Sequence, residues 1–311
     1  MKQRYFKSLL TTILLLCSAV LNAQDISVQY TGFEYQDIYY KFTGGSTVAV
    51  GEIYKSGDIE IPEIVPCALD LIEGYFTVTS IGDNAFENET DVTSVKIPKT
   101  VPSIGEHAFR ECTSLTSITI PNSITHIGYG AFRNSSGLKE VIIEDGEDAI
   151  YISESDSKGY PYAYWHAAFA SCPLETVYIG RDIKYYGTWY FDEYDVSHFA
   201  NHGTLKKAVY GDKITCVRNG AFEDCPNLEY VTIPNSITSI GPRAFVDCSS
   251  LKEIKIPNTI KRIEERTFTG CSSLTSITIP NSVDTIEVAA FYGCSGLKEV
   301  IIEDGVNGLY M

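Results

Sequence analysis

The chain has 311 residues, of which 44% are hydrophobic, and its mean hydropathy is −0.03. This composition is typical of a folded protein with enough apolar side chains for a core. The formal net charge is −16, and a surface this acidic repels nucleic acid and anionic lipid headgroups, which excludes both as partners.

The first 23 residues have the pattern of a signal peptide. Three basic residues occur among the first seven, an apolar run extends over residues 9–21, and Ala23 follows as a small residue at the exit. The apolar run is too short for a membrane span, so we expect export with cleavage after Ala23 and no membrane insertion. Removing the three positive charges changes the net charge from −16 to −19. A lipid anchor at Cys17 is disfavoured, because leucines precede it where a small residue is normal.

Residues 24–77 are predicted to form an N-terminal β cap. The segments 28–42 and 46–53 are rich in Tyr, Val and Thr, and Gly44 and Gly45 lie between them, which is typical of a hairpin. A β cap of this kind closes the exposed first edge of a stacked repeat array.

From residue 78 onward, phenylalanine recurs with a fixed spacing. The interval is 23 residues in two series, with one further copy 37 residues after the first series and 30 residues before the second. The positions are Phe86, Phe109, Phe132, Phe169, Phe199, Phe222, Phe245, Phe268 and Phe291. A fixed period in this range predicts a solenoid over residues 78–311.

One repeat, residues 112–134, shows how each coil is expected to fold. Residues 118–120 alternate between apolar and polar and predict a short strand, which Pro121 ends because it lacks a backbone donor. Residues 124–127 allow a second short strand, and residues 131–132 begin a short helical or irregular outer segment. Successive coils are expected about 4.8 Å apart, which is the spacing of neighbouring strands.

Two small residues of this repeat have expected structural roles. Gly128 is predicted to adopt a positive φ at the corner of the coil. Ser123 recurs as Ser236, Thr259 and Ser282, so its hydroxyl is expected to bond along the stack.

Cysteine occupies the third position after the repeat phenylalanine in six coils: Cys112, Cys172, Cys225, Cys248, Cys271 and Cys294. Free cysteine is a small apolar core residue. Side chains stacked in register run parallel rather than toward one another, and this geometry disfavours disulfides. We therefore predict free thiols.

The repeats CSSLTSITIPNSV (271–283) and NLEYVTIPNSITSIGPRAF (227–245) resemble those of the BspA-like leucine-rich-repeat proteins, which bacteria of the Bacteroides group export. The match covers residues 78–150 and 199–305 in its period, Ile-Pro-Asn-Ser turn, Ile-Gly corner and Ala-Phe-x-x-Cys. The resemblance implies a right-handed, β-rich leucine-rich-repeat solenoid of the α/β type, with coils of about 23 residues and short parallel strands. It also implies cell-surface or secreted placement and adhesion or host-protein binding, with no shared catalytic site.

Some coils depart from the family pattern, and we expect these departures to degrade the coil edges. Glutamate replaces the corner glycine at Glu264 and Glu287, and the turn proline is replaced at Glu144, Gly180 and Gly211.

Aromatic insertions at about 151–196 interrupt the repeats. This stretch holds 13 aromatic residues in 46 positions, more than twice the chain average of 12%. The candidate ligand-binding residues in it are Tyr160, Tyr162, Tyr164, Trp165, Tyr178, Tyr185, Tyr186, Trp189, Tyr190 and Tyr194, and Tyr230 lies on a later repeat. Aromatic side chains can stack on sugars or anchor a protein partner, but most aromatic residues serve packing.

The outward-facing strand positions form a second candidate surface. They include Thr116, Ser117, Thr119, Glu229, Tyr230, Thr232, Lys252, Glu253, Lys255, Thr275, Ser276 and Thr278. Binding hot spots favour Tyr, Trp and Arg, and this surface offers only Tyr178 and Tyr230, so a solvated face is the competing interpretation.

No catalytic or metal-binding motif is evident. His198 and His202 have the spacing of two helical metal ligands, but they flank the repeat Phe199 and lack a third ligand. The acidic runs 144–148 and 192–195 lack the alternation of a calcium loop. We expect no cofactor, no metal and no enzymatic activity; turnover on a polysaccharide through Asp192 and Glu193 would overturn this expectation.

The sequence therefore predicts an exported, monomeric interaction or adhesion module that recognises an extracellular or host protein. A glycan-binding module that uses the aromatic insertion and a spacer without its own ligand are the alternatives. The last residues, GLKEVIIEDGVNGLYM (296–311), closely copy GLKEVIIEDGEDAIYI (137–152). Either the acidic pair Glu303 and Asp304 caps the last coil, or the chain is a shortened product.

Overall fold

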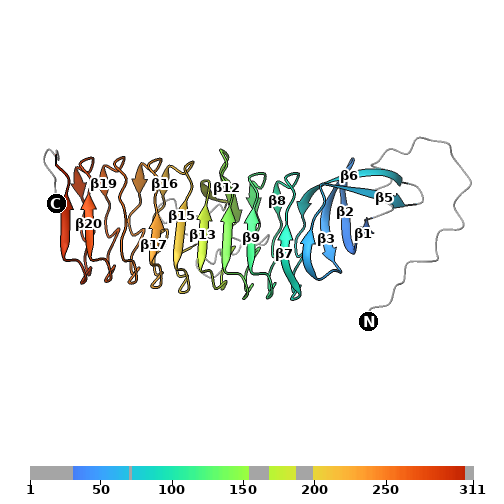
Figure 1. Ribbon diagram of the computed structural model, residues 1–311. Helices are drawn as coiled ribbons and strands as arrows, with labels where there is room; N and C mark the ends of the chain where they lie inside the picture. Colours follow the sequence, from blue (N-terminus) through green and yellow to red (C-terminus); the bar gives the residue numbers. More distant parts are fainter. Residues whose placement is uncertain (1–30, 70–71, 154–167, 187–198, 305–311) are drawn as a thin grey trace, which may run out of the picture.

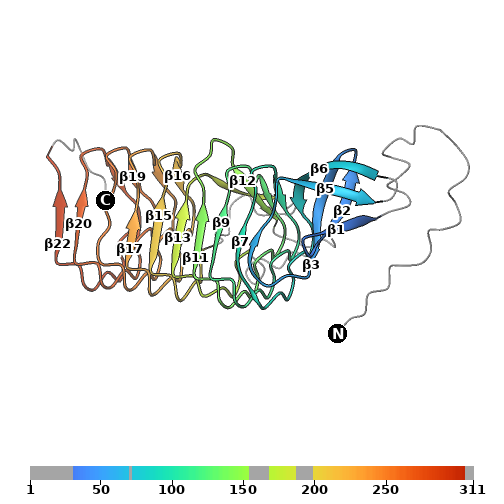
Figure 2. The same cartoon turned by 45° about the vertical axis from the view of Figure 1, so that its right-hand side comes forward.

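The computed structural model describes residues 31–69, 72–153, 168–186 and 199–304. Within these ranges there are 22 strands and no helix. The strands form one elongated stack of coils, with a larger β unit at the N-terminal end (Figures 1 and 2). The β-rich leucine-rich-repeat architecture expected from the sequence is confirmed.

The N-terminal unit consists of six strands around a sheet that continues into the stack. The strands are β1 (Gly32–Tyr35), β2 (Ile38–Gly44), β3 (Thr47–Ile53), β4 (Gly57–Glu60), β5 (Ile64–Leu69) and β6 (Ile72–Ile81). Strands β1, β2 and β3 pair antiparallel in sequence, and β5 pairs antiparallel with β6. Strand β6 also lies parallel to β3 and β8, so it joins the unit to the first repeats.

A first column of parallel strands runs along one side of the stack. Its members after β4 are β7 (Val92–Lys96), β9 (Ser117–Ile120), β11 (Glu140–Ile143), β13 (Thr176–Ile179), β15 (Lys207–Tyr210), β17 (Tyr230–Thr232), β20 (Ser276–Ile279) and β22 (Glu299–Ile302). Strands β9 to β17 form a continuous five-stranded sheet, and a bridge between Tyr230 and Glu253 extends it by one coil. Figure 1 shows these strands side by side along the axis of the stack.

A second column of shorter strands lies on a neighbouring side. It contains β8 (Ser103–Ile104), β10 (His126–Ile127), β12 (Ile150–Ser153), β14 (Ile183–Tyr186), β16 (Cys216–Val217), β18 (Ser239–Ile240), β19 (Arg262–Ile263) and β21 (Thr285–Ile286). Strands β8, β10, β12 and β14 are parallel and continue the sheet of the N-terminal unit.

The third side of each described coil consists of turns rather than a short helix. Two residues after the repeat phenylalanine, φ is positive in every coil, at Asn88, Glu111, Asn134, Ser171, Asn201, Asp224, Asp247, Gly270 and Gly293. Two residues before it, φ is positive at Asn84, His107, Gly130, Gly220, Arg243, Arg266 and Ala289. A left-handed residue on each side of the phenylalanine prevents a right-handed helix from forming there.

The repeat phenylalanines form one continuous column inside the stack. Consecutive rings from Phe86 to Phe291 are stacked, with centroid separations between 4.6 and 6.3 Å. The two irregular steps are no exception, because Phe169 lies 5.0 Å from Phe132 and 6.0 Å from Phe199. Each irregular step is therefore a single coil that carries extra residues, and the layered solenoid is confirmed.

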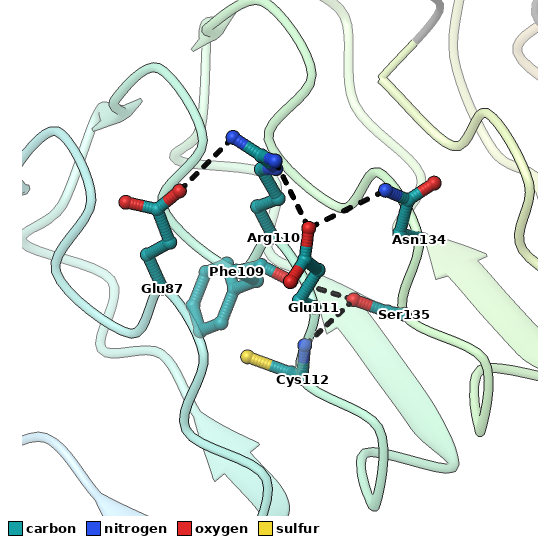
Figure 3. A network of polar contacts seen from close by, with 7 residues as sticks. All are labelled: Glu87, Phe109, Arg110, Glu111, Cys112, Asn134 and Ser135. Carbon is teal, nitrogen blue, oxygen red and sulfur yellow. Dashed lines mark hydrogen bonds and ion pairs between the residues drawn. The ribbon is translucent and has the colours of Figure 1, made fainter.

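The cysteines form a ladder of thiol hydrogen bonds beside the phenylalanine column. Each thiol donates to the carbonyl oxygen of the phenylalanine one coil earlier, at 2.9–3.2 Å for all six cysteines. Ser135 takes the same place, because its Oγ donates to Phe109 O at 2.7 Å and accepts from the Cys112 amide (Figure 3). Next to it, Arg110 pairs with Glu87 at 3.2 Å and with Glu111 at 2.9 Å. The thiol thus adds a bond between coils to carbonyls that, at Phe86, Phe132, Phe245 and Phe268, also accept a backbone amide within their own turn.

All cysteines of the described ranges are free, as predicted. Burial raises the pKa of the thiols of Cys112, Cys172 and Cys225 to about 12. Because the thiolate is the reactive form, these cysteines are inert while the coil is folded.

Two smaller sequence expectations were wrong. Gly128 does not have a positive φ; a Cβ at this position would collide with the backbone of Gly105 and Glu106 in the preceding coil. The hydroxyls of Ser123, Ser236 and Ser282 have no partner among the described residues, and of this set only that of Thr259 bonds along the stack, to Ile237 O.

Four of the five departures from the family pattern leave the coil edges bonded; the exception is Glu264, where the second strand column is interrupted between β18 and β19. The Glu144 carboxylate accepts the backbone N–H of Asn122 at 3.1 Å, and the amides of Gly180 and Gly211 bond to the preceding coil at 2.8 Å. The Glu287 amide donates to Ile263 O at 2.9 Å, much as the Gly128 amide donates to Ile104 O. The backbone bonds between coils therefore persist at Glu144, Gly180, Gly211 and Glu287.

Candidate functional site

The candidate site is the outward surface of the first strand column, here called the sheet face. In β9, β11, β13 and β15 the second and fourth residues are buried, and the first and third residues point outward. Together with the residue that precedes each strand, these positions form three rows along the axis. The strand period of two exposes the first and third residues, and the third exposed side chain of each coil belongs to the residue just before the strand.

An apolar stripe crosses the middle of the sheet face. It consists of Ile142, Tyr178 and Val209, the third residues of β11, β13 and β15, which are aligned by the register of the sheet. All three are half-buried, whereas the equivalent Thr119 and Thr232 on either side are exposed. The stripe is thus bounded by polar positions at both ends.

Tyr178 is held in place at the centre of this stripe. Its hydroxyl donates to the carboxylate of Asp145, with distances of 2.9 and 3.0 Å to the two oxygens. Burial and this bond to Asp145 raise the pKa of the Tyr178 hydroxyl above its usual value. The ring therefore presents a fixed surface and needs little ordering when a partner binds.

A row of alternating charges, here called the Lys–Glu ladder, runs beside the stripe. It contains Lys139, Glu175, Lys206, Glu229 and Lys252 in successive coils. Glu175 pairs with Lys139 at 3.2 Å and with Lys206 at 2.7 Å, and Glu229 pairs with Lys252. Hydrogen bonds from Lys206 and Lys139 lower the pKa of the Glu175 carboxyl. Each exposed pair contributes little to stability, so the ladder mainly fixes where the charges lie.

Tyr230 stands at the C-terminal side of the stripe, on β17. It is 45% exposed, and the Lys252 ammonium lies 5.4 Å from its ring centroid. This cation–π contact orients an aromatic side chain that remains available to solvent.

The sheet face is neutral overall although the chain is acidic. From β4 to β22 it carries seven lysines and seven carboxylates. These are Lys96, Lys139, Lys206, Lys207, Lys252, Lys255 and Lys298, and Asp58, Glu60, Glu140, Glu175, Glu229, Glu253 and Glu299. The excess negative charge of −16 therefore lies elsewhere on the protein.

The structure places few of the aromatic residues singled out from the sequence. Tyr178 and Tyr230 lie on the sheet face, in different rows and two strands apart. Tyr185 and Tyr186 belong to β14 in the second column, so they are not part of this surface. The others, Tyr160, Tyr162, Tyr164, Trp165, Trp189, Tyr190 and Tyr194, lie outside the described residues, as do Asp192 and Glu193.

The structure describes only one residue of the histidine pair, His202. His202 is buried with its Nδ1 3.2 Å from Cys172 O, and His198 lies outside the described residues. No cluster of three or more potential metal ligands occurs in the described ranges.

A small cavity lies between the coils of β13 and β15. Its volume is about 40 Å³, and its lining includes Ile183, Phe199, Tyr210 and Cys216. A space of this size is far smaller than the pockets that bind drug-sized ligands. Across the ranges that the structure describes, no helix is long and apolar enough to cross a membrane.

Comparison with known proteins identifies the repeats. The family model for the BspA type leucine-rich repeat region matches residues 67–155 and 193–310 in six copies. No curated protein matches the chain.

Several solved structures are similar to this one. A leucine-rich-repeat protein of T. pallidum is 21% identical, with a TM-score of 0.48 over 71% of this chain and 90% of that chain. One from Bacteroides ovatus is 22% identical, with a TM-score of 0.36 over 90% of this chain and 99% of that chain. A leucine-rich cell surface protein of Faecalibacterium prausnitzii is 23% identical, with a TM-score of 0.34 over 88% of this chain and 94% of that chain. Since the family model covers more than half of the 311 residues, the chain belongs to the BspA type leucine-rich-repeat family.

Proposed function

We propose that this protein is an exported, non-catalytic module that binds an extracellular protein through its sheet face. The observation that carries the proposal is the apolar stripe of Ile142, Tyr178 and Val209 on a charge-neutral face of an acidic protein. The basic and apolar start of the chain supports export, and the family supports an interaction role.

The arrangement has the features of a protein-binding surface. Tyrosine anchors contribute most of the binding energy when they become desolvated, and Tyr178 and Tyr230 are both preordered by contacts with Asp145 and Lys252. The Lys–Glu ladder forms a polar rim whose charges are already paired. A rim of this kind discriminates between partners through the register of their charges more than it adds affinity.

A binding assay with sheet-face variants tests the proposal. The protein is applied to a panel of immobilised extracellular-matrix proteins, with a glycan array run beside it. Any matrix protein that binds should lose at least tenfold in affinity with Val209→Glu, which places a charge in the stripe, and a similar amount with Tyr230→Ala. The matched control is Tyr292→Ala, a tyrosine that is 74% exposed outside the sheet face, and it should bind like the wild type.

Two results would contradict the proposal. Binding of a matrix protein that is unchanged in both sheet-face variants would place recognition elsewhere. A glycan that binds equally well to the wild type and both variants, in the absence of any protein ligand, would favour the aromatic insertion at 151–196 instead.

A further inference from the structure

Like features of the sheet face recur in every second coil. The lysines of the Lys–Glu ladder are Lys139, Lys206 and Lys252, and a glutamate lies in each coil between them. The two tyrosines of the face, Tyr178 on β13 and Tyr230 on β17, are also two coils apart. Neighbouring paired strands are about 4.8 Å apart, so this two-coil interval is about 9.6 Å along the axis. The positive charges and the aromatic side chains therefore share one axial period.

A track one residue wide lies between the Lys–Glu ladder and the apolar stripe. The sheet aligns the first residues of β11, β13, β15 and β17 in this track, which are Glu140, Thr176, Lys207 and Tyr230. In each coil the ladder residue comes just before the strand and the stripe residue is the third of the strand. The ladder and the stripe are therefore three residues, or about 10 Å, apart. One polypeptide segment lying on the track can contact both.

Among the regular polypeptide conformations, polyproline II matches the two-coil period best. It has three residues per turn with a rise of about 3.1 Å, so equivalent residues recur about every 9.3 Å. Over the two periods from Lys139 to Lys252 the mismatch is about 0.6 Å. Two turns of an α-helix are about 10.5 Å long, which gives a mismatch of about 1.8 Å over the same distance. Residues on one side of a β-strand recur about every 6.7 Å and do not follow the ladder.

The chemistry of the sheet face also suits this conformation. Polyproline II segments dock on aromatic side chains, and they lose little conformational entropy because the helix is already formed in the free chain. Tyr178 is fixed by its bond to Asp145, and Tyr230 is 45% exposed beside the Lys252 ammonium. The ladder has three lysines and two glutamates, so it favours acidic side chains in a partner. Its own ion pairs do not oppose this, because each exposed pair contributes little to stability.

We propose that the partner of the sheet face is a proline-rich segment in the polyproline II conformation, with an acidic residue at every third position. This inference rests on the proposed function, because it names the partner class of the same surface. The segment would lie along the axis over Thr176 and Lys207, and about seven residues would extend from one end of the ladder to the other. Its acidic side chains would pair with the three ladder lysines, and its prolines would contact the apolar stripe.

Two synthetic peptides with the same residue types and different spacing test the period. The probes are (Glu-Pro-Pro)4 and (Glu-Pro-Pro-Pro)4, each labelled with a fluorophore and titrated with the full chain at physiological salt while anisotropy is recorded. In the second peptide the glutamates are about 12.4 Å apart and turn away from one face, so only the first peptide can place them on successive ladder lysines. We expect saturable binding of the first peptide, at least fivefold tighter than that of the second.

A variant of the central ladder lysine tests the contact itself. Lys206→Gln should weaken binding of (Glu-Pro-Pro)4 at least fivefold and reduce its advantage over the second peptide. The Lys206 side chain is 57% exposed, so the variant should fold normally. The matched control is Lys261→Gln, because Lys261 is an exposed lysine that comes just before β19 in the second strand column. It should bind both peptides like the wild type.

The outcomes separate this inference from the proposed function. Absence of saturable binding, equal affinity for the two peptides, or no effect of Lys206→Gln would overturn the inference. A matrix protein that loses binding with Val209→Glu but is not displaced by (Glu-Pro-Pro)4 would also overturn it, and would leave the proposed function in place. A matrix protein that binds unchanged to Val209→Glu and Tyr230→Ala would remove the proposed function and this inference with it.

Discussion

Replacing Phe245 by alanine is expected to lower the free energy of unfolding by about 3–5 kcal/mol. The Phe245 ring is fully buried and stacked between Phe222 at 5.8 Å and Phe268 at 5.5 Å. The two neighbouring coils lose contacts at once, because each coil of a repeat array is stabilised mainly by the coils beside it. Urea denaturation followed by circular dichroism measures the change, as a shift of the midpoint.

Tyr292→Ala is the matched control for this variant. Tyr292 is an aromatic residue on the outside of the same array, 74% exposed, and its removal should change the free energy of unfolding by less than about 0.5 kcal/mol. Equal effects of the two substitutions would mean that the phenylalanine column does not stabilise the solenoid.

Arg181→Ala should destabilise the protein by about 2–6 kcal/mol, although the residue lies in an irregular coil. The side chain is only 1% exposed, and its two terminal nitrogens donate to Asn122 O at 3.0 Å and Pro121 O at 2.9 Å. Burial lowers the pKa of Arg181, while Asp148 and Glu144 favour its charge. Alanine would remove both bonds from the charged guanidinium, each worth about 1.5–3 kcal/mol, and would leave Pro121 O with the Ile124 amide as its remaining donor. Differential scanning calorimetry measures the loss.

Lys213→Ala provides the comparison for Arg181. Lys213 pairs with Glu147 in the same region at 2.6 Å, but both side chains are more than half exposed, so the expected change is below about 1 kcal/mol. If Arg181→Ala were as mild as Lys213→Ala, the buried guanidinium would not anchor its irregular coil to the turn at Pro121 and Asn122.

The fold was predictable because one spacing repeats. Phenylalanine every 23 residues and Pro121 after a short alternating segment are sufficient for a layered stack, since equivalent side chains must then lie above one another. The turns were less predictable. A left-handed φ at Asn134 follows from its residue type, but the same conformation at Arg243 and Arg266 does not. The close approach of backbones at Gly128 depends on the neighbouring coil, which no local pattern reveals.

The candidate site was predictable only in part. Tyr178 and Tyr230 stand out by residue type, whereas Ile142 and Val209 look like core residues until the register shows which face they occupy. The Lys–Glu ladder was missed for a related reason. Glu229 and Lys252 are 23 residues apart and follow the repeat, but Lys139, Glu175 and Lys206 are separated by the irregular steps, so their alignment requires the strand pairing.

The central claim is that partners bind the sheet face. A blocking experiment tests this claim most directly. The buried thiols are inert, so replacing the half-buried Cys216 and Cys294 by serine gives a background in which one introduced cysteine can be labelled. A bulky maleimide is attached at Thr232→Cys on the sheet face or at Glu265→Cys on the turn side, both exposed positions, and binding to the captured matrix protein is measured. Binding should be lost with the label at position 232 and retained with the label at position 265. Retention at 232 with loss at 265 would contradict recognition by the sheet face.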